Sequence, residues 1–200
     1  MPVKKSNIVS FIKTNGGFAR FSVLIKAGFH RDTISASVKK GLIRTISRGI
    51  YQLSDYDIGE YPDLVQASLQ SPKGIVCLIS ALAFHEATNE IPRYVDMAIP
   101  SYTRANKVKY PPVKFYRFDM RAYEAGVEEH KVGSQKFRVY SLAKTIADCF
   151  KFRNRIGMNV VRNAMKTAIL EKKVKTNEIM KFAKICRVDN VIKPIIEAML

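Results

Sequence analysis

Residues 28–53 read GFHRDTISASVKKGLIRTISRGIYQL, a pattern that predicts a helix followed by a β-hairpin. Apolar residues recur at helical spacing within residues 30–40, and Gly41 ends that helix. Two runs rich in β-branched residues, at 42–46 and 50–53, flank a short turn, which is typical of a hairpin. The outer face of the predicted helix is polar and basic and is free to contact a partner.

Two shorter helical patterns precede this stretch, at residues 8–14 and 21–27, and glycines follow both of them. Three helices and a hairpin within residues 1–55 predict a winged helix-turn-helix domain that binds DNA. Residues 54–62 are acidic and aromatic, contain a glycine and a proline, and lack helical spacing, so we expect a linker there. Residues 63–200 are predicted to form a second domain.

The second domain combines helical patterns with a small sheet. A short helix is predicted at residues 62–69, and an almost wholly apolar run predicts a buried helix over residues 75–87. Three strands are predicted, at residues 94–99, 113–118 and 136–140. Residues 124–131 show no strand pattern, and helical spacing returns from residue 141 onward. The expected fold class is α+β: an N-terminal winged helix-turn-helix, then a mixed domain with a small sheet and several C-terminal helices.

Positive charge is concentrated at the two ends of the chain. The net charge is +17 at pH 7, and the isoelectric point is near 9.9. Residues 1–55 contain ten Lys and Arg against two acidic residues, residues 151–200 contain twelve against four, and residues 56–150 are nearly balanced. We therefore expect a polyanionic partner, and the charge ratio of the first segment favours double-stranded DNA over protein.

A winged helix inserts its third helix into the major groove of DNA and holds phosphates with basic side chains around that helix. The residues at these positions are Arg20, Arg31, Thr33, Ser35, Lys39, Lys40, Arg44 and Arg48. A second basic surface is expected from Lys151, Arg153, Arg155, Arg162 and Lys166. This second surface would lengthen the DNA contact, meet an acidic face of a protein partner, or be a solvated face.

The sequence has no spacing typical of a catalytic or metal site. Its three histidines lie far apart, without a HExxH motif or a pair of cysteines. Asp119 with Glu129 and Lys131 would suit a metal-dependent nuclease, but the segment around the last two residues has no strand pattern. The three cysteines lie in apolar helical patterns typical of packed thiols, and their odd number fits a reducing cytoplasm. We expect no enzyme activity, no cofactor, no bound metal and no membrane span.

Several motifs occur in an order that resembles a known family. The motifs are Gly28-Phe29, Gly41-Leu42-Ile43-Arg44, SRGIYQL at 47–53, PKGIVCLISAL at 72–82, and Val139-Tyr140-Ser141 followed by Thr145 and Asp148. In this order and spacing they resemble the AbiEi-family antitoxins of bacterial type IV toxin-antitoxin systems, which act in abortive phage infection. The resemblance implies a winged-helix domain that represses its own operon at inverted repeats. It also implies a carboxy-terminal domain that counteracts a nucleotidyltransferase-like toxin, directly or functionally.

Two other functions remain open from the sequence. One is a winged-helix transcription factor whose second domain senses a ligand or mediates assembly, and the other is a metal-dependent nuclease with a DNA-targeting head. A toxin reading frame directly downstream would favour the antitoxin, and magnesium-dependent cleavage would favour the nuclease. Ser80, Tyr140 and Asp148 are expected to be structural, with Asp148 accepting a hydrogen bond from a backbone or arginine donor.

Overall fold

A computed structural model describes residues 7–57, 59–132 and 135–199. These residues form two sheets, one of three strands and one of five, together with helices, which confirms the predicted α+β class. We call the described residues 7–53, which contain the first sheet, the amino-terminal unit. The described residues from 61 onward, which contain the second sheet, are the carboxy-terminal unit.

The amino-terminal unit contains α1 (Ile8–Thr14), β1 (Phe18–Arg20), α2 (Phe21–Lys26), α3 (Arg31–Lys39), β2 (Ile43–Ser47) and β3 (Ile50–Leu53). Its three helices and its hairpin lie where the sequence predicts them. The sequence did not predict β1, because a strand of three residues is too short to show a periodic pattern. β1 pairs antiparallel with β3, so the strand order is β1-β3-β2.

The first sheet has two different faces. Ala19, Ile43 and Leu53 are buried in a cluster with side chains of all three helices. Successive side chains of a strand point to opposite faces of the sheet. Phe18 precedes Ala19 on β1, and its register partner Gln52 precedes Leu53 on β3, so both lie on the opposite face. Only one face of the sheet therefore covers the helices.

The other face of this sheet contacts the carboxy-terminal unit. Phe18 is 3% exposed and belongs to a buried cluster made mainly of carboxy-terminal residues. The Arg20 guanidinium donates a hydrogen bond to the Leu69 carbonyl over 2.6 Å, and the Gln135 amide donates to the Asn15 carbonyl over 2.6 Å. An apolar anchor and two hydrogen bonds thus join the two units.

The first part of the carboxy-terminal unit contains α4 (Pro62–Gln70), β4 (Ile75–Val76), α5 (Leu78–Phe84), β5 (Val95–Pro100), β6 (Val113–Phe118), α6 (Met120–Glu124), β7 (Val127–Val132) and β8 (Gln135–Tyr140). The five strands lie in the order β6-β5-β4-β8-β7. β5 and β6 are parallel, as are β4 and β8, whereas β4 and β5 are antiparallel and so are β7 and β8. The three predicted strands and the first predicted helix are confirmed.

Two predictions for this unit are wrong. The helix expected over residues 75–87 begins only at Leu78, because Ile75 and Val76 form a wholly buried strand between β5 and β8. A continuous apolar run does not distinguish a buried strand from a buried helix. Residues 127–132 are a strand, although no strand was expected there; β7 is an edge strand, and charged residues are common in such strands.

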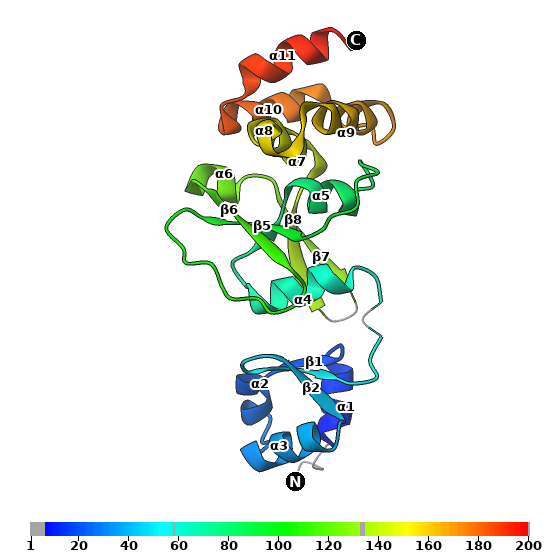
Figure 1. The fold of residues 1–200 in the computed structure, drawn as a ribbon, viewed down its shortest axis with the longest axis vertical. Helices are drawn as coiled ribbons and strands as arrows, with labels where there is room; N and C mark the ends of the chain where they lie inside the picture. Colours follow the sequence, from blue (N-terminus) through cyan, green and yellow to red (C-terminus); the bar gives the residue numbers. More distant parts are fainter. Residues whose placement is uncertain (1–6, 58, 133–134, 200) are drawn as a thin grey trace.

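A layer of helices completes the carboxy-terminal unit: α7 (Leu142–Lys151), α8 (Arg153–Ile156), α9 (Met158–Leu170), α10 (Thr176–Cys186) and α11 (Asp189–Glu197). Figure 1 shows this layer at one end of the long axis and α3 at the other, with the five-stranded sheet between them. All residues of α7 from Leu142 to Phe150 are buried. No helix in the described part of the chain is long and apolar enough to span a bilayer.

The prediction that a backbone or arginine donor forms a hydrogen bond to Asp148 is wrong. Its carboxylate accepts hydrogen bonds from the Lys144 ammonium, one turn earlier on α7, and from the Cys186 thiol. No backbone amide or arginine of the described residues donates to it. Ser80 has the structural role expected of it, since its hydroxyl donates to the Tyr94 carbonyl and accepts from the Asp96 amide.

Candidate nucleic-acid interface

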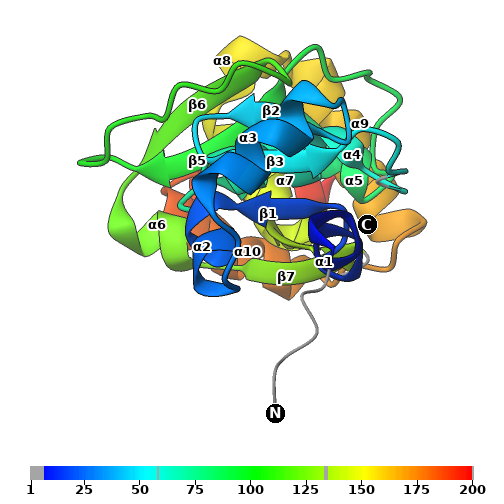
Figure 2. The ribbon, with the colours of Figure 1, turned by 90° about the horizontal axis from the view of Figure 1, so that it is seen from below.

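α3 turns its polar side to solvent. Ile34 and Ser37 are buried against the rest of the amino-terminal unit. The exposed side chains include Arg31, Thr33, Ser35, Lys39 and, directly after the helix, Lys40. Arg31, Ser35 and Lys39 follow one another at intervals of four residues, so they form one stripe along the helix. Figure 2 shows α3 in front of the first sheet when the molecule is seen from this end.

Contacts to α2 fix the position of α3. The Phe29 amide donates to the Leu24 carbonyl over 3.0 Å, which closes the turn between the two helices. The Arg31 guanidinium lies 5.4 Å from the centroid of the Phe21 ring at the start of α2. The Phe11 and Phe29 rings pack edge to face, with centroids 5.3 Å apart. The exposed side of α3 is therefore presented by a packed scaffold.

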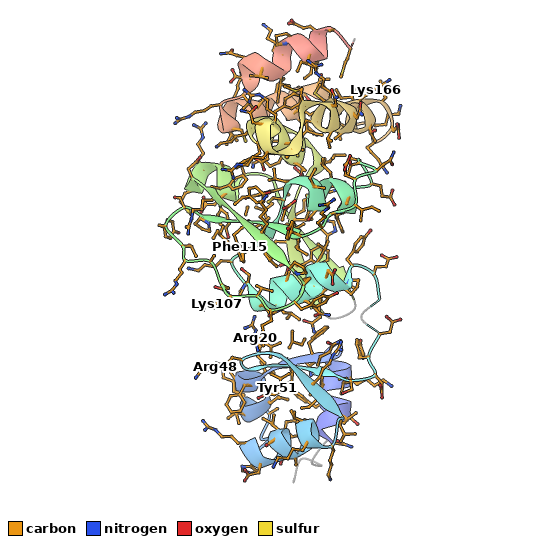
Figure 3. The ribbon with its side chains drawn as sticks, viewed as in Figure 1. Arg20, Arg48, Tyr51, Lys107, Phe115 and Lys166 are labelled. Carbon is orange, nitrogen blue, oxygen red and sulfur yellow. The ribbon has the colours of Figure 1, made fainter. Side chains whose placement is uncertain are left out.

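A backbone hydrogen bond joins the turn of the β2–β3 hairpin to the start of α2. Gly49 has a φ of 74°, a left-handed conformation that favours glycine, and its carbonyl accepts from the Phe21 amide over 2.8 Å. The neighbouring Arg48 is exposed. Figure 3 shows Arg48 in the half of the amino-terminal unit that is nearer to the carboxy-terminal unit, whereas α3 lies at the far end. Arg48 therefore lies to the side of the exposed face of α3.

Arg20 and Arg44 lie on the sheet face that is turned away from the helices. The Arg20 guanidinium contacts the Leu69 carbonyl in the carboxy-terminal unit. Arg44 donates through Nε and Nη2 to the Gln52 side-chain oxygen, over 3.1 and 3.0 Å. Arg44 and Gln52 are partners in the sheet register, and Gln52 lies on the same face as Phe18, so Arg44 lies on that face too. The structure thus separates these two arginines from the residues on α3 with which the sequence grouped them.

The positive charge of the amino-terminal unit is uncompensated. Residues 7–53 contain eight Lys and Arg, and Asp32 is the only acidic residue among them. Across the described residues, none of these eight cations lies in an ion pair with a carboxylate. The unit therefore produces a positive potential at the end of the molecule where α3 is exposed.

The second predicted basic set lies in the helical layer at the opposite end of the molecule, where Figure 3 shows Lys166. Arg162 and Lys166 are exposed on α9. The Lys151 ammonium is 3.8 Å from an oxygen of Asp119, and Arg153 donates to the carbonyl of Phe150 over 2.8 Å. The remaining member, Arg155, is exposed and lies 5.9 Å from the ring of Phe152. The two basic sets do not share a face.

The residues considered for a nuclease do not converge. Asp119 is the N-cap of α6 and accepts from the Ala122 amide, a hydrogen bond that lowers the pKa of its carboxyl. Glu129, on β7, pairs with Lys136. The described residues contain no group of three His, Cys, Asp or Glu side chains able to hold a metal ion.

The three cysteines are buried, as expected. Burial raises the pKa of the Cys77 and Cys149 thiols well above the ordinary value, and it raises the pKa of the Cys186 thiol to about 12. Such thiols stay protonated near neutral pH and are poor nucleophiles. His85 is half-buried with Nε2 2.8 Å from the Tyr140 carbonyl, and burial lowers its pKa.

Sequence reasoning missed a group of exposed cations between β5 and β6. Residues 101–112 contain Arg104, Lys107 and Lys109, all exposed, and no acidic residue. The charge count over residues 56–150 concealed them, because acidic residues elsewhere in that range balance the total. A count over a shorter window would have found them.

The described residues thus offer one exposed basic helix at an end of the molecule and two further groups of cations away from it. Exposed Lys and Arg side chains of this kind are able to form ion pairs and charged hydrogen bonds. In comparisons with known proteins, no family model and no curated protein matches the chain.

Proposed function

We propose that this chain is a DNA-binding autorepressor and the antitoxin of a type IV toxin-antitoxin pair. The observation that carries the DNA-binding half is the exposed, unpaired basic side of α3 at a free end of the molecule. The order of three helices followed by the β2–β3 hairpin supports a winged helix-turn-helix, in which α3 enters the major groove. The partner is double-stranded DNA carrying an inverted repeat.

The side chains of α3 divide into two roles in this proposal. Arg31, near the amino end of α3, together with Thr33 and Ser35, reads base edges, because guanidinium and hydroxyl groups match the acceptors and donors of the major groove. Lys39 and Lys40 hold phosphates and fix the position of the helix on the duplex. Arg48 adds a phosphate contact at the side.

Binding to the DNA upstream of the chain's own gene tests this half. The variant Arg31→Gln/Lys39→Gln removes both charges and leaves an uncharged polar side chain at each position. We expect its affinity in a fluorescence anisotropy titration to fall by at least about tenfold, since hydrogen bonds to charged groups contribute about 1.5–3 kcal/mol each. The matched control, Lys184→Ala/Lys193→Ala, removes two exposed charges from α10 and α11 and should bind as the wild type does. Equal affinity of the α3 variant and the control would refute the assignment.

The antitoxin half rests on the motifs that resemble the AbiEi family. The distance between α3 and the helical layer supports it, because a protein bound to DNA through α3 leaves that layer accessible. Growth of cells that express a cognate nucleotidyltransferase-like toxin, with and without this chain, tests it. Rescue of growth is the expected outcome, and no rescue by soluble full-length protein would refute it.

A pocket favours the alternative of a ligand-sensing transcription factor. Its volume is about 610 Å³, and it lies between the start of α7 and the segment that joins α9 to α10. His85, Glu128, Lys172 and Lys181 contribute polar side chains to its wall. A small molecule that changes operator affinity in wild-type protein, but not in a Lys172→Ala variant, would favour this function over the antitoxin.

A further inference from the structure

The connection between β5 and β6 is an unusual crossover. Parallel neighbours in a sheet are generally joined through a helix that packs on the sheet. Here residues 101–112, which we call the β5–β6 loop, contain no helix or strand, and most of them are exposed, although Pro111 is buried. The loop therefore contributes surface to the molecule and little to its core.

Hydrogen bonds hold the backbone of this loop at three places. The Arg117 guanidinium donates to the carbonyls of Ser101 and Thr103, over 2.9 and 2.7 Å. The Asn106 side chain donates to the Gln70 carbonyl over 2.6 Å. The Gln70 side chain in turn donates to the Tyr110 carbonyl over 2.7 Å. The loop is thus anchored to β6 and to the end of α4.

The anchored backbone leaves aromatic rings in solvent. Tyr102 is 71% exposed, Tyr110 is 59% exposed, and Tyr94, beside the end of the loop, is 50% exposed. No other tyrosine of the described residues is exposed. By the register of β5 and β6, Tyr94 and Tyr110 lie where these strands begin and Tyr102 lies where they end, so the rings are spread along the loop. Exposed rings along one loop indicate an extended binding surface, because apolar groups in water are unfavourable unless a partner uses them.

Cations are interleaved with these rings. Arg104, Lys107 and Lys109 lie on the loop and are exposed, as is Arg93 beside Tyr94. No acidic residue occurs between Asp96 and Asp119. Within the described residues, no carboxylate pairs with a cation of the loop. The surface is therefore both aromatic and strongly positive.

A pocket of about 260 Å³ lies at the foot of the loop. Pro111 and Pro112 form one wall, and Tyr61, Phe84 and Tyr94 contribute rings. Flat apolar walls of this kind accept a planar ring by stacking. Arg93 and Asp63 also line the pocket.

We propose that the β5–β6 loop, with this pocket, binds single-stranded nucleic acid. Exposed tyrosines stack on unpaired bases, and interleaved Lys and Arg follow the phosphates of the strand. Duplex DNA does not use the rings, because its bases are already stacked inside the helix. An acidic protein would satisfy the cations but would leave the three rings without planar partners.

This site is separate from the proposed duplex contact. Figure 3 shows Lys107 at the end of the carboxy-terminal unit that is nearer to the amino-terminal unit, whereas α3 lies at the far end of the molecule. A single strand on the loop and a duplex on α3 therefore occupy different surfaces, and Figure 3 shows Arg48 between the two. Failure of one proposal leaves the other standing.

The test is a fluorescence anisotropy titration of the full chain with a labelled 12-nucleotide single strand of mixed sequence, as RNA and as DNA, and with the matching DNA duplex. The variants are Tyr102→Ala, Tyr102→Phe and Lys107→Ala/Lys109→Ala, with Lys184→Ala/Lys193→Ala as the charge-matched control. We expect Tyr102→Ala to weaken single-strand binding at least about fivefold and Tyr102→Phe, which keeps the ring, to bind as the wild type does. Lys107→Ala/Lys109→Ala should reduce the slope of log affinity against log salt by about 1.4, twice the value for one single-strand phosphate.

The comparison of the RNA titration with the DNA titration identifies which kind of single strand the site binds. Tighter binding of RNA than of DNA of the same sequence would assign the site to RNA, and equal binding would assign it to single strands in general. Arg31→Gln/Lys39→Gln should leave single-strand affinity unchanged while duplex affinity falls. Three outcomes would overturn the proposal: loop variants that bind single strands as the control does, a Tyr102→Phe variant as weak as Tyr102→Ala, or a duplex that displaces the single strand at equal concentration.

Discussion

The Lys144 ammonium lies 2.6 and 2.5 Å from the two carboxylate oxygens of Asp148, and both side chains are completely buried. The same ammonium is 4.2 Å from the centroid of the Tyr140 ring, and the Cys186 thiol donates to the carboxylate over 3.2 Å. Burial raises the pKa of Asp148, and the charge of Lys144 opposes that effect. The pair links α7, at the centre of the helical layer, to α10.

Asp148→Ala should destabilise the protein by about 3–5 kcal/mol, because it leaves the Lys144 ammonium buried without a partner. Urea unfolding of the purified variant measures this loss. The double variant Lys144→Met/Asp148→Leu removes both charges and fills the space, so it should retain much more of the free energy of unfolding. Equal losses in the two variants would mean that packing, and not the unpaired charge, determines the effect.

Asp96 should make stability depend on pH. It is 6% exposed, and burial raises the pKa of its carboxyl to about 6, an effect that hydrogen bonds from Tyr116 and Ser80 partly offset. A carboxyl that binds its proton more tightly in the folded state than in the unfolded state contributes stability at low pH. That contribution is full below the unfolded pKa of 3.8 and is lost as the pH rises through 6.

The comparison with Asp96→Asn isolates this group. Between pH 4 and pH 7, the free energy of unfolding of the wild type should fall by about 2.4 kcal/mol relative to the variant, since one pKa unit corresponds to about 1.4 kcal/mol and part of the contribution is already lost at pH 4. Urea unfolding at several pH values measures the difference. A difference that does not change with pH would contradict a raised pKa.

Phe18→Ser should loosen the contact between the two units, because it places a hydroxyl in the apolar cluster that joins them. We expect faster proteolysis in residues 54–60, with duplex affinity unchanged because α3 lies away from this contact. Ile25→Ser, which changes an apolar side chain that is 41% exposed, is the matched control and should be cleaved at the wild-type rate. Equal cleavage of both variants would show that Phe18 does not hold the units together.

Salt dependence separates the roles of the α3 side chains. Each lost phosphate contact reduces the slope of log affinity against log salt by about 0.9 for duplex DNA. Lys39→Gln/Lys40→Gln should therefore reduce the slope by about 1.8, while Ser35→Ala should leave it unchanged and alter sequence preference. Titrations at several salt concentrations, with matched and mismatched operators, provide both readouts; an unchanged slope for the lysine variant would exclude phosphate contacts there.

Arg162→Glu/Lys166→Glu should leave duplex affinity intact, because α9 lies at the opposite end of the molecule from α3. If the helical layer meets an acidic face of the toxin, the same variant should fail to rescue cells that express the toxin. Rescue assays and operator titrations on one protein preparation distinguish the cases. Loss of duplex affinity would mean that this surface lengthens the DNA contact, and two intact activities would leave a solvated face.

The elements that the sequence predicts well are those with a long, one-sided pattern. Ile34 and Val38 lie on the same side of α3, and the β-branched and aromatic residues that follow Pro111-Pro112 mark β6. β7 was missed because its exposed residues are charged and its apolar residues are few, as suits an edge strand. β4 was missed because two residues buried on all sides show no period at all.

The candidate interface was predictable in part for a similar reason. The exposed positions of α3 follow from helical spacing, so Arg31, Ser35 and Lys39 were found. The contact made by Arg20 was not, since its acceptor is the backbone carbonyl of Leu69, which no side-chain pattern reveals. The same holds for Asp148, whose surroundings depend on how α7 and α10 pack.

The two sheets lie one after the other along the long axis of the molecule, so the surface proposed to contact DNA is far from the helical layer. A duplex held by α3 meets only the narrow end of the molecule, so each copy occupies a short length of DNA. The helical layer then extends away from the duplex axis. In the proposed complex, copies on adjacent sites would therefore present their helical layers away from the duplex, where a partner would not compete for its bases.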